Sequence, residues 1–135
     1  ELLDQLGVDG DGAPDDAHIL FGGPVGRERG FVLHSEDYDS DGATLNVCEG
    51  VCLTATRDIL HAMTSDSPPE RFVLALGYSG WGAGQLESEL AANVWLVGIP
   101  DPALVYDPSL DTKWSRALAR IGVSPDKLQV TGGRA

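Results

Sequence analysis

The chain has 135 residues, of which 42% are hydrophobic, and its net charge is −12, with nine Lys and Arg against 21 Asp and Glu. This length and composition favour one globular domain over a disordered chain. The acidic balance repels phosphate groups, so direct binding to nucleic acid or to an anionic membrane is disfavoured. No apolar run approaches the length of a membrane span.

The N-terminal part predicts the end of a helix followed by two short strands. Residues 1–7 place leucines at helical spacing before a glycine, which is typical of the tail of a helix that begins outside this chain. The apolar runs at residues 18–21 and 30–34 predict strands. We expect the charged residues 27–29 between them to form a turn.

The middle of the chain predicts a hairpin and a helix. Residues 43–47 and 51–53 predict strands, and the Glu49-Gly50 pair between them fits a tight turn. Thr54 or Thr56 can cap a helix over residues 57–63. That helix carries an apolar stripe made of Ile59, Leu60 and Met63.

The next stretch combines a strand, a glycine-rich turn and a helix. Residues 71–76 are almost continuously apolar, as expected for a strand covered on both faces. Residues 77–84 read GYSGWGAG and contain four glycines, and residues 85–93 predict a helix. We expect a further strand at residues 94–97.

The C-terminal part predicts a loop, a helix and a tail. Residues 100–108 are expected to form the loop, and residues 111–121 an amphipathic helix. Trp114, Leu118 and Ile121 share one face of that helix. Residues 122–135 are a C-terminal tail with a short predicted strand at 128–130. The mixed order of strands and helices favours an α+β or α/β domain.

The glycine-rich turn is the first candidate site. Its backbone amides can cradle an anion, but the spacing is not G-x-G-x-x-G and no Gly-Lys-Ser/Thr follows. The favoured interpretation is that glycine lets the strand turn tightly and lets Trp81 pack closely. In the helix that follows, Gln85 and Glu89, and Glu89 and Asn93, are four residues apart. They can therefore present one polar face to a ligand or partner, or simply to solvent.

Catalytic and metal-binding patterns are weak. Cys48 and Cys52 lack zinc-site spacing, so they are two small apolar residues or a disulfide. We predict neither a metal nor a cofactor. Ser79 sits in a sequence resembling a nucleophile elbow, but Trp81 stands where that motif needs glycine. His34 precedes Ser35 and carries no further catalytic pattern.

Arg27 and Arg29 form a rare basic spot on this acidic chain. Guanidinium groups at that spacing can bind a carboxylate or a phosphate. The alternative is that they pair internally with the excess of acidic side chains.

Three segments carry a resemblance to a known family. They are LFGGPVGRERGFVLHS, LTATRDIL and RFVLALGYSGWGAGQLESELAANVWL, followed by the pattern of Asp111, Trp114, Ala117 and Leu118. Over about residues 20–118 the chain resembles the AlgH/YqgE family of bacterial proteins. The resemblance implies an α+β single domain with a mixed, strongly bent β-sheet and flanking helices.

The resemblance also implies that strands normally precede the segment at Glu1. We therefore expect residues 1–135 to be one AlgH-like domain in an N-terminally truncated form. Family members are often labelled transcriptional regulators, and the family supplies no catalytic residues. A regulatory role would be indirect, because the chain has no helix-turn-helix pattern and no basic patch.

We predict a non-enzymatic, cytoplasmic binding or regulatory protein that acts through residues 77–93. A protein or small molecule is the expected partner, and the oligomeric state stays open. With only two cysteines, a reducing compartment is the default. The alternatives are an indirect transcriptional regulator and an enzyme that uses Ser79 or the two arginines. The predicted binding residues are Arg27, Arg29, Tyr78, Trp81, Gln85 and Glu89.

Overall fold

A computed structural model describes residues 19–128 of the chain. The chain divides into two compact units, unit 1 up to Ser79 and unit 2 from Gly80. The predicted helix end at residues 1–7 lies outside the described residues, as does most of the predicted strand at 128–130. None of the helices within residues 19–128 is long and apolar enough to cross a membrane.

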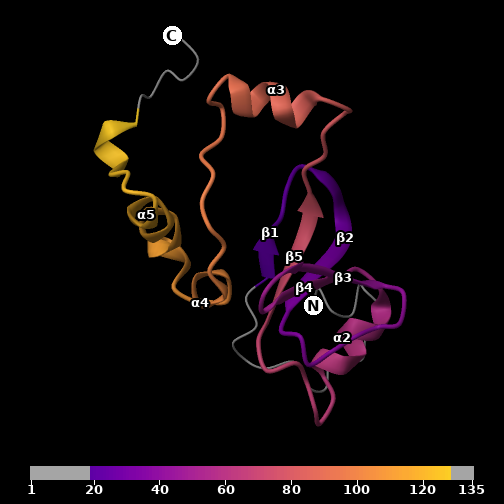
Figure 1. Cartoon of the computed structure of the whole chain (residues 1–135). Coiled ribbons are helices and arrows are strands. Elements are labelled where there is room, and N and C mark those ends of the chain that lie inside the picture. Colours follow the sequence, from indigo (N-terminus) through magenta and orange to yellow (C-terminus); the bar gives the residue numbers. More distant parts are fainter. Residues whose placement is uncertain (1–18, 129–135) are drawn as a thin grey trace. The chain divides into compact units, whose positions relative to one another are not determined.

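Unit 1 is built on a mixed five-stranded sheet with the strand order β1-β5-β2-β4-β3 (Figure 1). Strands β1 and β5 are parallel, and all other neighbours are antiparallel. The prediction of an α+β fold with a mixed sheet is therefore confirmed. The strands are β1 (Ile19–Phe21), β2 (Val25–His34), β3 (Thr44–Cys48), β4 (Val51–Thr54) and β5 (Phe72–Tyr78).

The prediction of a charged turn at residues 27–29 was wrong, because these residues belong to β2. Val25 already pairs with Tyr78, and the register then shifts before Gly30 pairs with Leu76. Gly26 has φ +53° within this irregular stretch. A bulged strand accommodates the three charged side chains because all of them are exposed.

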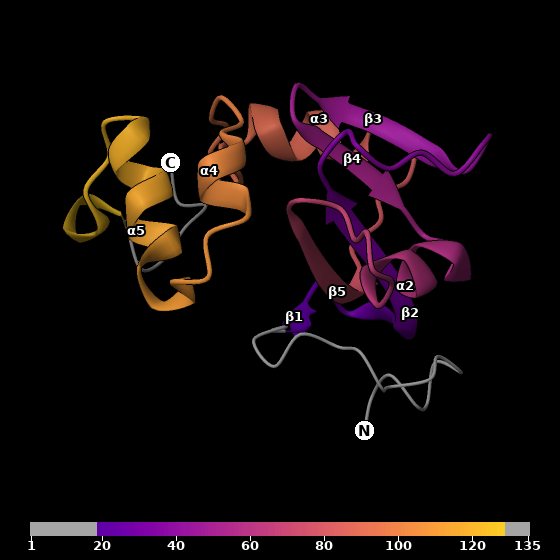
Figure 2. The ribbon, with the colours of Figure 1, turned by 90° about the horizontal axis from the view of Figure 1, so that it is seen from below.

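Helix α2 (Arg57–Met63) covers one face of the sheet (Figure 2). It begins after Thr56, one of the two predicted caps, although the Thr56 side chain makes no capping hydrogen bond. The predicted apolar stripe is buried against the sheet. The core consists of Val32, Ile59, Leu60, Met63 and Leu74, each at most 6% exposed.

A buried chain of hydrogen bonds joins β2, β4 and β3. His34 and Thr54 are both 0% exposed, and His34 Nε2 lies 2.8 Å from Thr54 Oγ1. Thr54 Oγ1 lies 2.8 Å from Thr44 Oγ1, which accepts from the Ser40 N–H. His34 Nδ1 lies 2.8 Å from the Ser35 carbonyl, which can only accept, so Nδ1 carries a proton. In the tautomer protonated at Nδ1 alone, Nε2 accepts from the Thr54 hydroxyl.

The ends of β1, β2 and β5 meet through a glycine contact. A Cβ at Gly77 would lie 2.4 Å from the Gly23 carbonyl oxygen, and one at Gly22 would lie 2.3 Å from the Gly77 carbonyl oxygen. Gly77 also has φ +79°. The expectation that glycine permits a tight turn after β5 therefore has a specific cause at Gly77, which is both crowded by backbone and left-handed.

Unit 2 contains three short-to-medium helices: α3 (Gln85–Ala91), α4 (Pro102–Val105) and α5 (Leu110–Arg120). A 3-10 turn follows at Pro125–Lys127. Helix α4 was not predicted. It starts at a proline, and the Asp101 carboxylate caps it by accepting from the Ala103 N–H at 3.0 Å.

The prediction of a strand at residues 94–97 was wrong. Asn93 has φ 58°, and the Val94 N–H closes the end of α3 by donating to the Glu89 carbonyl. Residues 95–99 form no backbone hydrogen bond with any part of the chain that the structure describes. A strand needs a neighbouring backbone, and apolar composition alone does not provide one.

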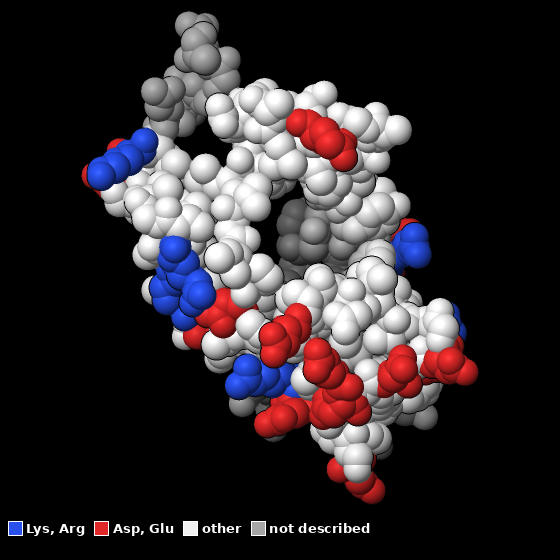
Figure 3. Space-filling view, viewed as in Figure 1, with Lys and Arg blue, Asp and Glu red and all other residues white. Residues whose placement is uncertain are grey.

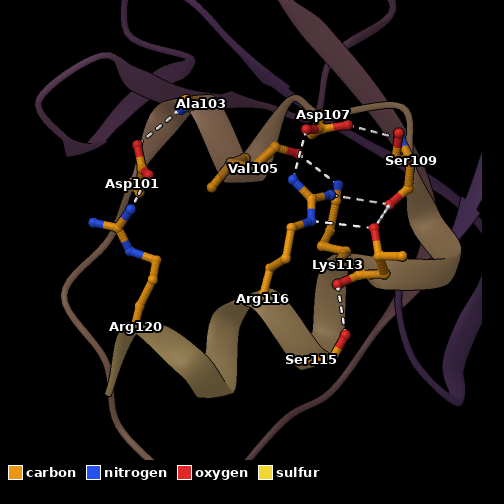
Figure 4. A network of polar contacts seen from close by, with 10 residues as sticks. Asp101, Ala103, Val105, Asp107, Ser109, Lys113, Ser115, Arg116 and Arg120 are labelled. Carbon is orange, nitrogen blue, oxygen red and sulfur yellow. Dashed lines mark hydrogen bonds and ion pairs between the residues drawn. The ribbon is translucent and has the colours of Figure 1, made fainter. Parts of the chain in front are cut away.

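Salt bridges join α5 to the segment before it (Figure 4). Arg116 Nη1 donates to Asp107 Oδ2 at 2.7 Å, and Arg120 pairs with Asp101. Lys113 donates to the Val105 carbonyl at 2.9 Å. Of the predicted apolar face of α5, Leu118 is buried, whereas Trp114 is 61% exposed. The helix is thus held largely by polar contacts.

We expect Gly77→Ala to destabilise unit 1 more than Gly42→Ala. Both glycines have φ between +75° and +79°, so both variants carry the left-handed strain of about 1–2 kcal/mol. Nothing lies within 4 Å of a Cβ at Gly42, whereas Gly77 faces backbone at 2.4 Å. The clash should add about 1–3 kcal/mol, measured as a lower urea midpoint. Equal midpoints would show that the contact is not close in solution.

We expect the α4–α5 contacts to weaken between about pH 4 and pH 2. Hydrogen bonds from Arg116 and then Ser109 lower the pKa of Asp107 to about 2. A depressed folded pKa stabilises the fold above the unfolded pKa and loses that effect as pH falls through the folded value. The protection of amides in residues 101–120, relative to their intrinsic exchange rate at each pH, should therefore fall in this window. Asp107→Asn should remove the pH dependence, and Asp126→Asn should leave it intact.

Candidate functional site

The predicted binding residues fall into two groups, one in each unit. Arg27, Arg29 and Tyr78 belong to unit 1, and Trp81, Gln85 and Glu89 belong to unit 2. Each group is described by itself.

In unit 1 the two arginines lie against aromatic rings. The Arg29 guanidinium carbon lies 5.5 Å from the centre of the Phe31 ring and 5.7 Å from that of Tyr78. The two rings meet edge to face at 5.6 Å. Arg27 lies 5.3 Å from the Phe21 ring. We call these residues, from β1, β2 and β5, the arginine–aromatic cluster.

The arginines are not neutralised by acidic side chains in the part of the chain described. Neither Arg27 nor Arg29 forms an ion pair or a side-chain hydrogen bond with residues 19–128. Within residues 19–128 the arginines therefore lack the internal pairing that the alternative expects. Their contacts with exposed rings contribute about 0.5–1 kcal/mol each, and their N–H groups stay available to solvent or a ligand.

A shallow cavity of about 370 Å³ lies between β2 and the start of α2. Its lining combines apolar side chains such as Val32 and Ile59 with the charged side chains of Glu28 and Arg57. Arg29 lines it, whereas Arg27, Tyr78 and Ser79 do not. The cavity thus does not unite the residues that an enzyme would need. It is lined by Glu28, Arg29, Gly30, Val32, Ala55, Thr56, Arg57, Ile59 and Leu60.

In unit 2 one carboxylate holds two tryptophans. Trp81 Nε1 and Trp95 Nε1 both donate to Glu89 Oε2, at 3.0 and 2.7 Å. Gln85 Nε2 donates to Glu89 Oε1 at 3.1 Å. The two indoles meet edge to face, with ring centres 5.8 Å apart. We call these four residues the tryptophan–glutamate cluster.

Local structure around α3 explains why this cluster forms. Gln85 and Glu89 are neighbours on one helix face, as their spacing predicts. The Gly82 N–H donates to Gln85 Oε1 at 3.0 Å, so the glutamine also fastens the loop that carries Trp81. The prediction that Gln85 and Glu89 share a helix face agrees with this geometry.

The cluster favours an ionised Glu89. Hydrogen bonds from Trp95, then Trp81 and Gln85, lower the pKa of the carboxyl below its ordinary value. Each indole N–H already donates to an acceptor within the cluster. The rings can therefore present apolar surface without leaving a donor unpaired. Sequence reasoning missed Trp95, which it assigned to a strand. The available signal was a second tryptophan six residues after Glu89.

Exposed apolar side chains continue from this cluster. Trp81 is 39% exposed and Trp95 47%. The residues after α3 are exposed still further, and we call residues 94–99 the apolar segment. Its exposed side chains are Val94 at 61%, Trp95 at 47%, Leu96 at 52%, Val97 at 72% and Ile99 at 86%. Contiguous exposed apolar patches commonly mark interaction surfaces, whereas single exposed apolar residues do not.

No catalytic arrangement links the serine and histidine candidates. Within residues 19–128 no serine hydroxyl bonds to a histidine ring. Ser35 Oγ donates to Asp37 Oδ1 at 2.5 Å, and the His34 ring is turned into the buried threonine network. The same residues hold no group of three or more His, Cys, Asp or Glu side chains suited to a metal. Cys48 and Cys52 are free thiols, so the disulfide alternative is wrong here.

Comparison with known proteins places this geometry in a family. The family model described as AlgH-like matches residues 1–126. A UPF0301 protein of Caulobacter vibrioides is 53% identical over 137 residues, which cover 100% of this chain and 70% of the relative. A UPF0301 protein of Rhodospirillum rubrum is 44% identical over 135 residues, with the same coverage.

A solved structure agrees with the sequence comparisons. The solution structure of the AlgH protein from Pseudomonas aeruginosa is similar with a TM-score of 0.74 and 36% sequence identity. The similarity covers 99% of this chain and 71% of that one. The AlgH/YqgE resemblance of the sequence is confirmed, and the chain belongs to the AlgH-like family.

Proposed function

We propose that this protein acts by binding another protein through the tryptophan–glutamate cluster and the apolar segment. The observation that carries the proposal is that Glu89 fixes Trp81 and Trp95 while leaving both rings substantially exposed. The expected partner presents a complementary apolar surface. We propose binding without a chemical step, because the described residues offer no nucleophile–base pair beside this surface.

Rigid, exposed tryptophans are suited to protein binding. Tryptophan is enriched among the few interface residues that supply most of the binding energy. A side chain already held in place loses little conformational entropy when a partner arrives. Here three hydrogen bonds to the Glu89 carboxylate hold the cluster in place. The polar ends of the rings are satisfied before the partner binds, so only apolar area has to be covered.

We further propose that the protein works in the cytoplasm. The two cysteines are free although they lie on neighbouring strands, which suits a reducing compartment. The acidic surface argues against direct contact with nucleic acid. The arginine–aromatic cluster of unit 1 is a second candidate for binding a carboxylate or phosphate, because its guanidinium N–H groups form no ion pair with the described residues.

We expect Trp81→Ala to reduce partner binding at least tenfold, because truncating an interface tryptophan commonly removes 2 kcal/mol or more. Affinity purification from cell extract, followed by calorimetry on the protein recovered, would measure the loss. Trp114→Ala is the matched control, because Trp114 is 61% exposed on α5 and outside the cluster. Identical partners and affinities for both variants would refute the site.

We expect Glu89→Ala to release both tryptophans, because their N–H groups would lose a shared acceptor. The near-ultraviolet circular dichroism of the indoles should fall, and iodide should quench their fluorescence more strongly. Glu87→Ala on the same helix is the control, because no hydrogen bond to the Glu87 side chain is described. An unchanged spectrum for Glu89→Ala would show that the carboxylate does not hold the rings.

A further inference from the structure

Strand β3 is an open edge of the sheet. It pairs with β4 on one side, and no described strand lies on the other. In an antiparallel pair, alternate residues of the outer strand direct their N–H and C=O groups away from the sheet. Leu45 is 61% exposed and Val47 53%, and the pairing with β4 shifts its register between Asn46 and Cys48, which places a β-bulge at Val47.

This edge carries only part of the usual protection against pairing. Natural edge strands are commonly blocked by charged residues or proline. Strand β3 reads TLNVC and contains neither. The position of β3 is also fixed from the side of β4, because Thr44 Oγ1 lies 2.8 Å from the buried Thr54 Oγ1. The edge is therefore a fixed template with two exposed apolar side chains, and its length of five residues and the bulge at Val47 limit pairing along it.

Acidic side chains stand at both ends of β3. At its start Asp41 is exposed, and Ser40 Oγ donates to Asp58 Oδ2 at 3.4 Å. At its end Glu49 is exposed, and the Gly50 N–H donates to Glu36 Oε1 at 3.0 Å. In Figure 3 acidic side chains gather over the region that β3, β4 and α2 occupy in Figure 1.

These charges are not cancelled locally. None of the four carboxylates forms an ion pair with another of residues 19–128. On the neighbouring strand, burial first, and then the charges of Glu36 and Asp39, raise the pKa of the Cys52 thiol. An incoming strand would therefore meet an uncharged middle between two negative ends.

We propose that β3 binds an extended polypeptide as an added strand, with alternating apolar residues at its centre and Lys or Arg at both ends. Backbone pairing along the free edge supplies the register, and Leu45 and Val47 contact the apolar side chains of the ligand. The basic ends lie over the acidic groups that flank β3. Opposite charges steer the encounter and exclude acidic peptides.

A second copy of this chain is a poorer occupant. Two β3 strands pairing antiparallel would bring the start of one beside the end of the other, and both ends are acidic. The net charge of −12 adds a longer-range repulsion between copies. The two occupants respond oppositely to salt, because screening weakens attraction to a basic peptide and relieves repulsion between copies.

Three nine-residue peptides test the proposal against the whole chain. All have a five-residue centre of alternating valine and threonine; the first has two lysines at each end, the second glutamates there, and the third lysines with a central proline. Chemical shifts of β3 amides and calorimetry would follow binding. We expect only the first to bind, about tenfold more weakly at roughly 500 mM than at 50 mM salt.

Variants distinguish the contribution of strand pairing at β3 from that of the flanking carboxylates. Leu45→Lys should abolish binding of the lysine peptide. Asp41→Asn with Glu49→Gln should weaken it about tenfold, whereas the matched control, Asp66→Asn with Glu70→Gln, should leave it nearly unchanged. Shifts at Leu45 to Val47 in the wild type would support the site. Equal binding of the proline peptide, shifts confined to residues 94–99, or association of the chain with itself that grows with salt would each overturn the proposal.

Discussion

A backbone contact that only glycine permits organises unit 1. Gly77 approaches Gly22 and Gly23 so closely that no Cβ fits between them. This contact brings the end of β5 beside the turn between β1 and β2, so that β5 pairs with both strands. The sheet then offers one face to α2, whose apolar stripe covers Val32 and Leu74. Packing on that face depends on strands that the glycine contact allows to align.

Hydrogen bonds between polar side chains have different consequences in the two units. In unit 1 the His34 and Thr54 side chains are wholly buried and bonded to each other, so they join β2 to β4 and are closed to any ligand. In unit 2 the Glu89 carboxylate satisfies two indole N–H groups at the surface and leaves the rings available. A hydrogen bond thus stabilises a core in one place and prepares an apolar binding surface in the other.

The two proposed sites use unpaired backbone or apolar surface in different ways. The apolar segment after α3 has exposed side chains, and the proposed contact there is hydrophobic burial against a protein. The β3 edge has free backbone groups and acidic flanks, so the proposed contact there is strand pairing selected by charge. Because they lie in separate units, changes at Trp81 and at Leu45 should be separable in their effects.

The sequence by itself determined the family and the α+β class, through the three segments that resemble that family. It also determined most strands of unit 1 and the helices α2, α3 and α5, because local periodicity and turn residues specify these elements. It also identified Gln85 and Glu89 as neighbours, since helical spacing is a local property. Only the tertiary structure decided that residues 27–29 continue β2, that residues 94–97 are not a strand, and that Trp95 joins Trp81. The first depends on the distant β5 backbone, and the second on the lack of a neighbouring strand among residues 19–128. The third depends on the Glu89 carboxylate, six residues before Trp95.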